Sequence, residues 1–259
     1  MLDFNELDFT IVKFHKLCSA LVNNNYVPVT MEHYLSSRND LPERFVIMRH
    51  DIDKWPKAGL RAAHVEKDLG LKATYYFRTK NNVFVPQIIK EIEKMGHEVG
   101  YHYENLSTAD GDYEKAIGLF EEDVNRFREI CTLKTICMHG ASLSKHDNRD
   151  LWNKYDFRDF GILGEAYLSV GDELNYFTDT GRGWNSKSNL RDFIPGKNKR
   201  IFADTTDNLI GLIERGEVDN LYITLHPERW SANLSGWSFA WVLDLGYNSA
   251  KAILRWMRK

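Results

Sequence analysis

Acidic and histidine side chains follow four short apolar segments of this sequence, and side chains of these types can bind metal ions and transfer protons. They are Asp51 with Asp53, His102, His139 and His226. Histidine accounts for only 9 of the 259 residues, so chance would place far fewer of them at the ends of apolar segments. The pattern therefore predicts one site assembled from distant parts of the chain.

The two aspartates are two residues apart, so on an extended strand Asp51 and Asp53 face the same side. Adjacent carboxylates repel each other, and a divalent cation beside them removes that repulsion. Carboxylate oxygens and neutral imidazole nitrogens are ordinary ligands of Zn²⁺ and related ions. A bound ion acidifies water and polarises a carbonyl group, while a further carboxylate and a histidine can transfer protons. These residue types predict metal-assisted hydrolysis.

The elements that position these residues are expected to be alternating strands and helices. Buried strands are predicted at 45–48, 73–77, 98–102, 136–139, 201–203 and 221–225, and helices at 8–23, 56–69, 85–95, 112–130, 206–215 and 244–258. This alternation predicts an α/β fold with a parallel sheet, whose sites lie at the carboxyl ends of the strands. Long loops or short antiparallel pieces are expected over about 145–200, where Asn, Asp, Gly and Arg are frequent.

Composition narrows the class of protein. A hydrophobic share of 43% and a charged share of 27% match a soluble globular domain. A net charge of −3 argues against a nucleic-acid binder, and no apolar run is long enough for a transmembrane helix. The acidic N-terminus resembles no signal peptide and the three cysteines form no CxxC pair, so we expect a cytoplasmic location. With no linker dividing the chain, a helical preface over 1–40 is expected to precede the α/β unit over 41–259.

The order of these pieces resembles the polysaccharide deacetylase family, a carbohydrate esterase family 4-like group with the NodB-homology fold. The family motif Gly-His-Glu-Ile-Gly-x-His is matched by GHEVGYH at 96–102. The sequence RHDID at 49–53 stands in place of an earlier family motif, and Leu225-His226 fits the last one. The resemblance covers about residues 40–230. The chain looks like a divergent branch with Arg-His-Asp-x-Asp and His-Pro-Glu-Arg-Trp motifs, whose members look to belong to surface-polysaccharide biosynthesis, including that of lipopolysaccharide.

The resemblance implies a distorted (β/α) barrel over 41–259 that removes an N-acetyl or similar acyl group from a sugar. It implies that Asp51 is the catalytic base, that Asp53 and His102 bind the metal, and that His226 is the catalytic acid. The roles of the two aspartates are interchangeable at this point, because they are adjacent in the family and separated by one residue here.

One position departs from the family pattern. Leu106 stands where the family has its second metal-binding histidine, and leucine cannot bind a metal. Either the site has lost its ion, or another residue supplies the third ligand; for that ligand we favour His139, with Glu104 as the alternative. Glu104 is otherwise expected to contact the substrate.

Three further residues are candidates for substrate binding. They are Arg182, Trp184 and Arg229, because sugars stack on aromatic faces and arginine can hold a carboxylate. For Trp184, packing in the core is an equal alternative.

We therefore expect a metal-dependent hydrolase that removes an acetyl or formyl group from a sugar or from a lipid- or nucleotide-linked sugar. Zn²⁺ is the favoured ion, and Co²⁺, Ni²⁺, Mn²⁺ and Fe²⁺ remain alternatives. Two other functions stay open. One is hydrolysis of a small non-sugar amide or ureide on the same fold, and the other is sugar binding by an inactive pseudoenzyme, which Leu106 would favour.

Overall fold

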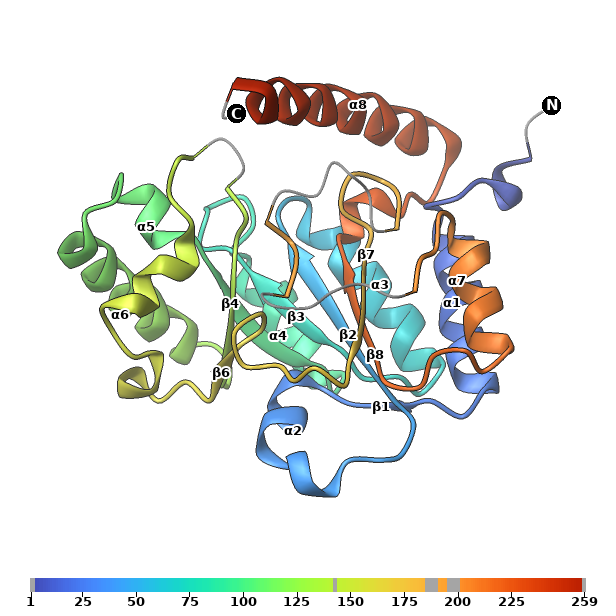
Figure 1. The fold of residues 1–259 in the computed structure, drawn as a ribbon, viewed down its shortest axis with the longest axis horizontal. Coiled ribbons are helices and arrows are strands. Elements are labelled where there is room, and N and C mark those ends of the chain that lie inside the picture. The colour runs from blue at the N-terminus through green and yellow to red at the C-terminus, as the bar shows by residue number, and fades with distance from the viewer. Residues whose placement is uncertain (1–2, 142–143, 185–190, 195–200, 258–259) are drawn as a thin grey trace.

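The computed structural model describes residues 3–141, 144–184, 191–194 and 201–257, which form one parallel sheet surrounded by helices (Figure 1). The strands are β1 (Val27–Pro28), β2 (Phe45–Ile52), β3 (Thr74–Phe77), β4 (Glu98–Tyr103), β5 (Thr135–Met138), β6 (Gly164–Glu165), β7 (Asn175–Thr178) and β8 (Leu221–Leu225). The α-helices are α1 (Ile11–Asn23), α2 (Met31–Ser36), α3 (Pro56–Asp68), α4 (Pro86–Lys94), α5 (Asn105–Thr108), α6 (Tyr113–Arg128), α7 (Thr206–Glu214) and α8 (Leu234–Met257).

The strand order is that of a barrel with one opening. It runs β6-β5-β4-β3-β2-β8-β7, and β1 pairs with the start of β2. Neighbours in the chain are therefore neighbours in the sheet from β2 to β6, and β8 returns to the other side of β2. Among the described residues, no pairing joins β6 to β7. The predicted fold class, a single-domain distorted (β/α) barrel, is confirmed by this order.

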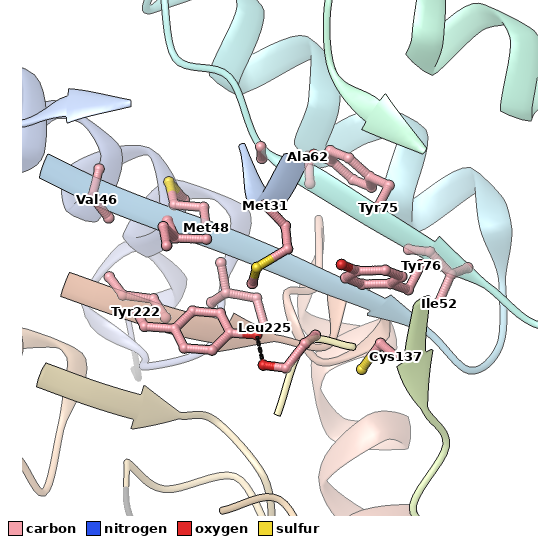
Figure 2. Close-up of a cluster of buried hydrophobic side chains, with 14 of the residues drawn as sticks. Met31, Val46, Met48, Ile52, Ala62, Tyr75, Tyr76, Cys137, Tyr222 and Leu225 are labelled. Atoms are coloured by element: carbon pink, nitrogen blue, oxygen red, sulfur yellow. Dashed lines mark hydrogen bonds between the residues drawn. The ribbon is translucent and has the colours of Figure 1, made fainter. Parts of the chain in front are cut away.

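The central strand is buried on both faces, as expected of a parallel strand covered by helices. All eight residues of β2 are buried. Figure 2 shows Val46, Met48 and Ile52 of this strand among Tyr75 of β3 and Tyr222 of β8. The helices present matching apolar stripes, such as Ile88, Ile89 and Ile92 on α4.

Strand β4 is tightly packed against its neighbours in the core. A Cβ atom at Gly100 would overlap the Tyr76 ring and lie 2.9 Å from the Thr135 carbonyl oxygen. The buried Glu98 carboxylate accepts hydrogen bonds from the Thr74 and Thr135 hydroxyls. Burial raises the pKa of Glu98 to about 7, although these hydrogen bonds oppose the rise. Most of this strand is thus committed to packing.

Helix starts follow local chemistry. The hydroxyl of Thr10 accepts a hydrogen bond from the Lys13 backbone N–H, and Asp112 caps α6 in the same manner. Thr205 and Asn208 form a reciprocal capping box at α7. These bonds satisfy N–H groups that a helix leaves without partners.

Three expectations differ from the structure. Residues 201–203 form no strand. The region 145–200 contributes β6 and β7, which pair in parallel rather than antiparallel fashion with β5 and β8. Helix α8 begins at Leu234, ten residues before the predicted start. The predicted preface over 1–40 supplies β1 and α1, and its boundary stays a prediction.

None of the helices within the described residues is long and apolar enough to cross a membrane.

Candidate active site

The strand ends open into one pocket of about 370 Å³ beneath α8. Its walls include Asp51, Asp53, His102, His139 and His226, so the structure brings together all five residues that follow the apolar segments. They lie on or directly after β2, β4, β5 and β8, whose carboxyl ends are at the same edge of the sheet because the strands are parallel. The location matches the usual place for sites in parallel α/β folds.

Asp53 lies between two imidazole rings. Its Oδ1 atom is 3.3 Å from His102 Nε2 and 3.4 Å from His139 Nε2. One ligand atom from each residue lies within 4.8 Å of the others, so the three could hold a metal ion. Within the described part of the chain, Asp53 Oδ1 is buried and has no hydrogen-bond partner. A buried oxygen without a partner is costly, and a cation between these side chains would supply one.

The negative charge of the Asp53 carboxylate suits the binding of a cation. Burial favours the protonated form of Asp53, but His139 and His102 hold its pKa well below the usual range. Burial alone would lower the pKa of His139, and the carboxylates of Asp53 and Glu104 raise it to about 9. Asp53 is therefore an anion, as a carboxylate ligand must be, whereas His139 would have to release its proton to bind a metal.

Each of the two imidazole rings is oriented by a group at its Nδ1 atom, on the side away from Asp53. His102 Nδ1 donates to the Cys137 carbonyl oxygen at 3.0 Å, which leaves Nε2 free to face Asp53. His139 Nδ1 lies 3.3 Å from Glu104 Oε2. Arg78 holds the Glu104 carboxylate with contacts of 2.7 to 3.0 Å. Such partners fix the tautomer and orientation of metal-binding histidines.

The position of Glu104 favours His139 over Glu104 as the third ligand. Burial raises the pKa of Glu104, but His139 and Arg78 together lower it to about 2. Its carboxylate is thus anionic and engaged by these two partners. Glu104 also borders the pocket, where we predicted a contact with the substrate.

Asp51 is a second, separately held carboxylate. Arg49 donates to its Oδ2 at 2.9 Å, and the hydroxyl of Tyr222 accepts from the same guanidinium at 2.9 Å. Asp51 Oδ2 is 3.9 Å from His102 Nε2, so it adjoins the candidate metal site. Asp51, His102 and Cys137 also lie close enough for a metal. Burial raises the pKa of the Cys137 thiol well above its usual value, however, and a protonated thiol is a poor ligand.

His226 is held by a carboxylate that sequence analysis did not single out. Asp179 accepts from His226 Nδ1 at 2.6 Å, from the His226 backbone N–H at 2.9 Å, and from Trp230 Nε1 at 2.9 Å. Burial and Arg229 lower the pKa of His226, but Asp179 outweighs them and raises it to about 9. Asp179 directly follows β7, so the strand-end rule would have found it had that strand been predicted.

Of the two arginines predicted to bind substrate, one borders the pocket and the other does not. Arg229 borders the pocket, and its guanidinium donates to Asp179 at 3.0 Å and lies 3.5 Å from Asp244. Arg182 is not part of the pocket wall and pairs with Asp244 at 3.2 Å. The structure therefore brings Arg229 to the site and places Arg182 behind it.

Trp184 is buried away from the pocket. Its ring packs against Phe9 and Trp230, and its Nε1 donates to the Thr206 hydroxyl at 3.0 Å. This is the packing alternative for Trp184.

Two further positions bear on the site. Leu106 packs with Ala109, Ala116 and Leu151 in a small apolar cluster outside the pocket wall. Glu228, which sequence analysis noted only within the His-Pro-Glu-Arg-Trp motif, borders the pocket. In the described residues its Oε2 has no hydrogen-bond partner, and burial together with Asp53 raises its pKa to about 7.

The strand order and this pocket define an open (β/α) barrel with a candidate metal centre. No protein-family model matches the sequence, and a search of curated proteins finds no match. A mutant CE4-family pseudoenzyme with restored enzymatic activity is similar in structure, with a TM-score of 0.41 and 15% identity over 83% of this chain and 69% of that chain. A second mutant described as a CE4-family pseudoenzyme has a TM-score of 0.39 and 14% identity over 82% of this chain and 68% of that chain.

Proposed function

We propose that this protein is a metal-dependent hydrolase that removes an N-acetyl or N-formyl group from a sugar or a sugar-linked intermediate. One observation supports this most: the cluster of Asp53, His102 and His139 shares a pocket with a separately held carboxylate, Asp51, and a charged histidine, His226. These are the groups needed to activate water and to protonate a leaving amine.

A divalent ion, Zn²⁺ foremost, held by Asp53, His102 and His139 would make water more acidic and polarise the acyl carbonyl. Asp51 is the base that takes a proton from water as the water oxygen adds to the acyl carbon. The contact with Arg49 keeps its carboxylate in place for this step. The position of Asp53 between the two imidazoles supports assigning it as the ligand and Asp51 as the base.

His226 supplies the second proton transfer. Its ring is charged at neutral pH because Asp179 stabilises the imidazolium. It donates a proton to the nitrogen as the C–N bond breaks, so the products are a free carboxylic acid and an amine. After the reaction Asp51 is protonated and His226 is neutral. Proton exchange with solvent returns both residues to their starting states.

The sugar class of substrate rests on the sequence resemblance and on the pocket wall. Trp55 and Tyr247 border the pocket beside Arg229, and aromatic faces with a nearby cation suit a carbohydrate. A place in cytoplasmic surface-polysaccharide biosynthesis is part of the same proposal.

Acyl release from N-acetyl and N-formyl sugars, beside a set of small amides and ureides, tests the proposal on the metal-loaded protein. We expect turnover of a sugar by the wild type and none by Asp51→Asn, with metal content unchanged in the variant. Full activity in both Asp51→Asn and His226→Ala would refute these roles. Calorimetric sugar binding without any product would instead favour a pseudoenzyme.

A further inference from the structure

The outward face of α8 carries large apolar side chains and no charged one over residues 234–249, although Ser235, Ser238 and Ser249 are exposed as well. Over residues 234–249 the sequence contains one charged residue, Asp244, and its side chain turns inward toward Arg182. The large apolar side chains exposed on this stretch are Leu234, Phe239, Trp241, Val242 and Leu245, while Tyr247 is exposed on the side that borders the pocket. Val242 is 59% exposed and Phe239 is 57% exposed. An exposed apolar patch of this kind commonly marks an interaction surface.

The position of α8 leaves this face accessible. The helix lies along one side of the molecule, and its outer side faces away from the sheet and the other helices (Figure 1). Trp55, in the turn after β2, extends the apolar face, since its ring centroid is 6.1 Å from that of Phe239. Trp55 is itself 43% exposed.

The charged residues that follow this stretch in the sequence are all basic. The last nine residues of the chain, 251–259, contain Lys251, Arg255, Arg258 and Lys259 and no acidic residue, although the chain as a whole carries a net charge of −3. An apolar helix face rich in Trp, Phe and Leu and accompanied by basic residues is typical of helices that lie in the surface of a bilayer. Basic residues beside such a helix are attracted to anionic lipids.

The opposite face of α8 forms part of the pocket wall. Ala240, Leu243, Asp244 and Asn248 border the pocket from this helix, and so does Tyr247, which is 48% exposed. The Tyr247 hydroxyl accepts a hydrogen bond from Lys54 at 3.0 Å, and Lys54 also borders the pocket. A partner bound to the outward face of α8 would therefore lie next to the pocket.

We propose that the outward face of α8 docks this protein on the surface of an anionic lipid bilayer, so that the pocket receives the acylated sugar headgroup of a lipid. The docking is argued from α8, Trp55 and the basic residues of 251–259, whereas the headgroup rests on the proposed hydrolase function.

Flotation of the full chain with phosphatidylcholine vesicles, with and without phosphatidylglycerol, tests the docking. We expect binding that strengthens with phosphatidylglycerol and weakens with added salt. Val242→Glu places a charge on the outward face and should weaken binding by about tenfold or more. The matched control is Val22→Glu, at an exposed position on α1, which should bind like the wild type.

Two results would overturn the docking. One is the absence of vesicle binding, whatever the oligomeric state of the protein. If the protein then forms a dimer that Val242→Glu dissociates, this face binds a second copy of the chain instead. The other is an equal loss of binding in Val22→Glu. Because vesicle binding needs no turnover, its failure would leave the hydrolase proposal intact, and loss of metal or activity would leave the docking result intact.

Discussion

Two buried clusters of histidine and carboxylate side chains lie on opposite sides of β2. His50 and Asp51 are neighbours on this strand and so point to opposite faces. His50 meets Glu66 of α3 at 2.6 Å, with Tyr75 and His97 alongside. On the other side, Asp51 adjoins the cluster around Asp53. The two clusters contain similar residues and differ in how their hydrogen bonds are arranged.

Around Glu66 the carboxylate is fully engaged. One oxygen contacts His50 and the other accepts from the Tyr75 hydroxyl at 2.5 Å. His97 accepts from the Ala73 backbone N–H through Nδ1 and donates to the Ala63 carbonyl oxygen through Nε2. Burial lowers the pKa of His97, so it is neutral, as this bonding requires.

The cluster around Asp53 has the opposite character. Asp53 Oδ1 faces two imidazole nitrogens without a hydrogen bond, while the second nitrogen of each ring is turned toward a group behind it. Residue types alone therefore do not distinguish a structural cluster from a ligand site. The distinction lies in whether the buried carboxylate oxygens bond to neighbouring groups or remain directed at a shared space, since among the described residues His50 Nδ1 also lacks a partner.

Removing one imidazole from each cluster gives the largest expected difference. His139→Ala should not bind the metal that we propose for this site, and its turnover should fall by about 10³-fold or more because such an ion contributes several kcal/mol. His97→Asn should keep one metal per folded chain. Metal analysis by mass spectrometry on the folded fractions checks both, and equal metal loss in the two variants would contradict the comparison.

Removal of the buried carboxylate on the structural side should act on stability. Glu66→Ala leaves His50 and Tyr75 without their partner and should lower the free energy of unfolding by about 3 kcal/mol. Glu66→Gln retains a hydrogen-bond acceptor and should lose less. Urea denaturation measures both variants, and a change in metal affinity without a change in stability would show that Glu66 serves the site instead.

The carboxylate behind His139 should act on metal affinity. Glu104→Gln keeps the shape but removes the charge that orients His139, so we expect metal affinity to fall by about 10- to 100-fold. Competition with a chelator of known affinity measures the change. A wild-type affinity in Glu104→Gln would mean that Glu104 has no orienting role.

The Asp179–His226 pair should have the smallest effect, seen in pH dependence. The folded protein raises the pKa of His226 from 6.5 to about 9, so the stability that this pair contributes is fully present below pH 6.5 and lost as pH rises through about 9. Turnover that needs the imidazolium should fall over the same alkaline range. Asp179→Asn should move that fall to lower pH, and an unmoved pH–rate profile would exclude His226 as the acid.

Much of this arrangement was predictable, because strong apolar runs mark the central strands. Residues 221–225 form the strand that their composition predicts, and the histidine after it borders the pocket. Asp179 was missed because β7 is a four-residue edge strand, Asn175–Thr178, with polar residues at both ends. Such a segment carries no apolar run or clear alternation.

Side-chain burial was harder to predict than strand position. Arg182 and Trp184 lie in a polar loop whose composition suits sugar binding, yet Asp244 and the ring of Trp230 engage them. These partners are distant in the chain, so no local pattern reveals them. The same holds for Arg78, whose contact with Glu104 joins the ends of different strands.

The close packing of β4 limits what the segment GHEVGYH says about chemistry. Of the seven residues 96–102, His102 alone borders the pocket, while Gly100 and Glu98 serve the sheet. Purifying selection on this segment would then act mainly through folding. A variant without hydrolytic activity could therefore keep nearly all of GHEVGYH, so this segment reports the packing of the sheet, and the chemistry has to be judged from the residues at the strand ends.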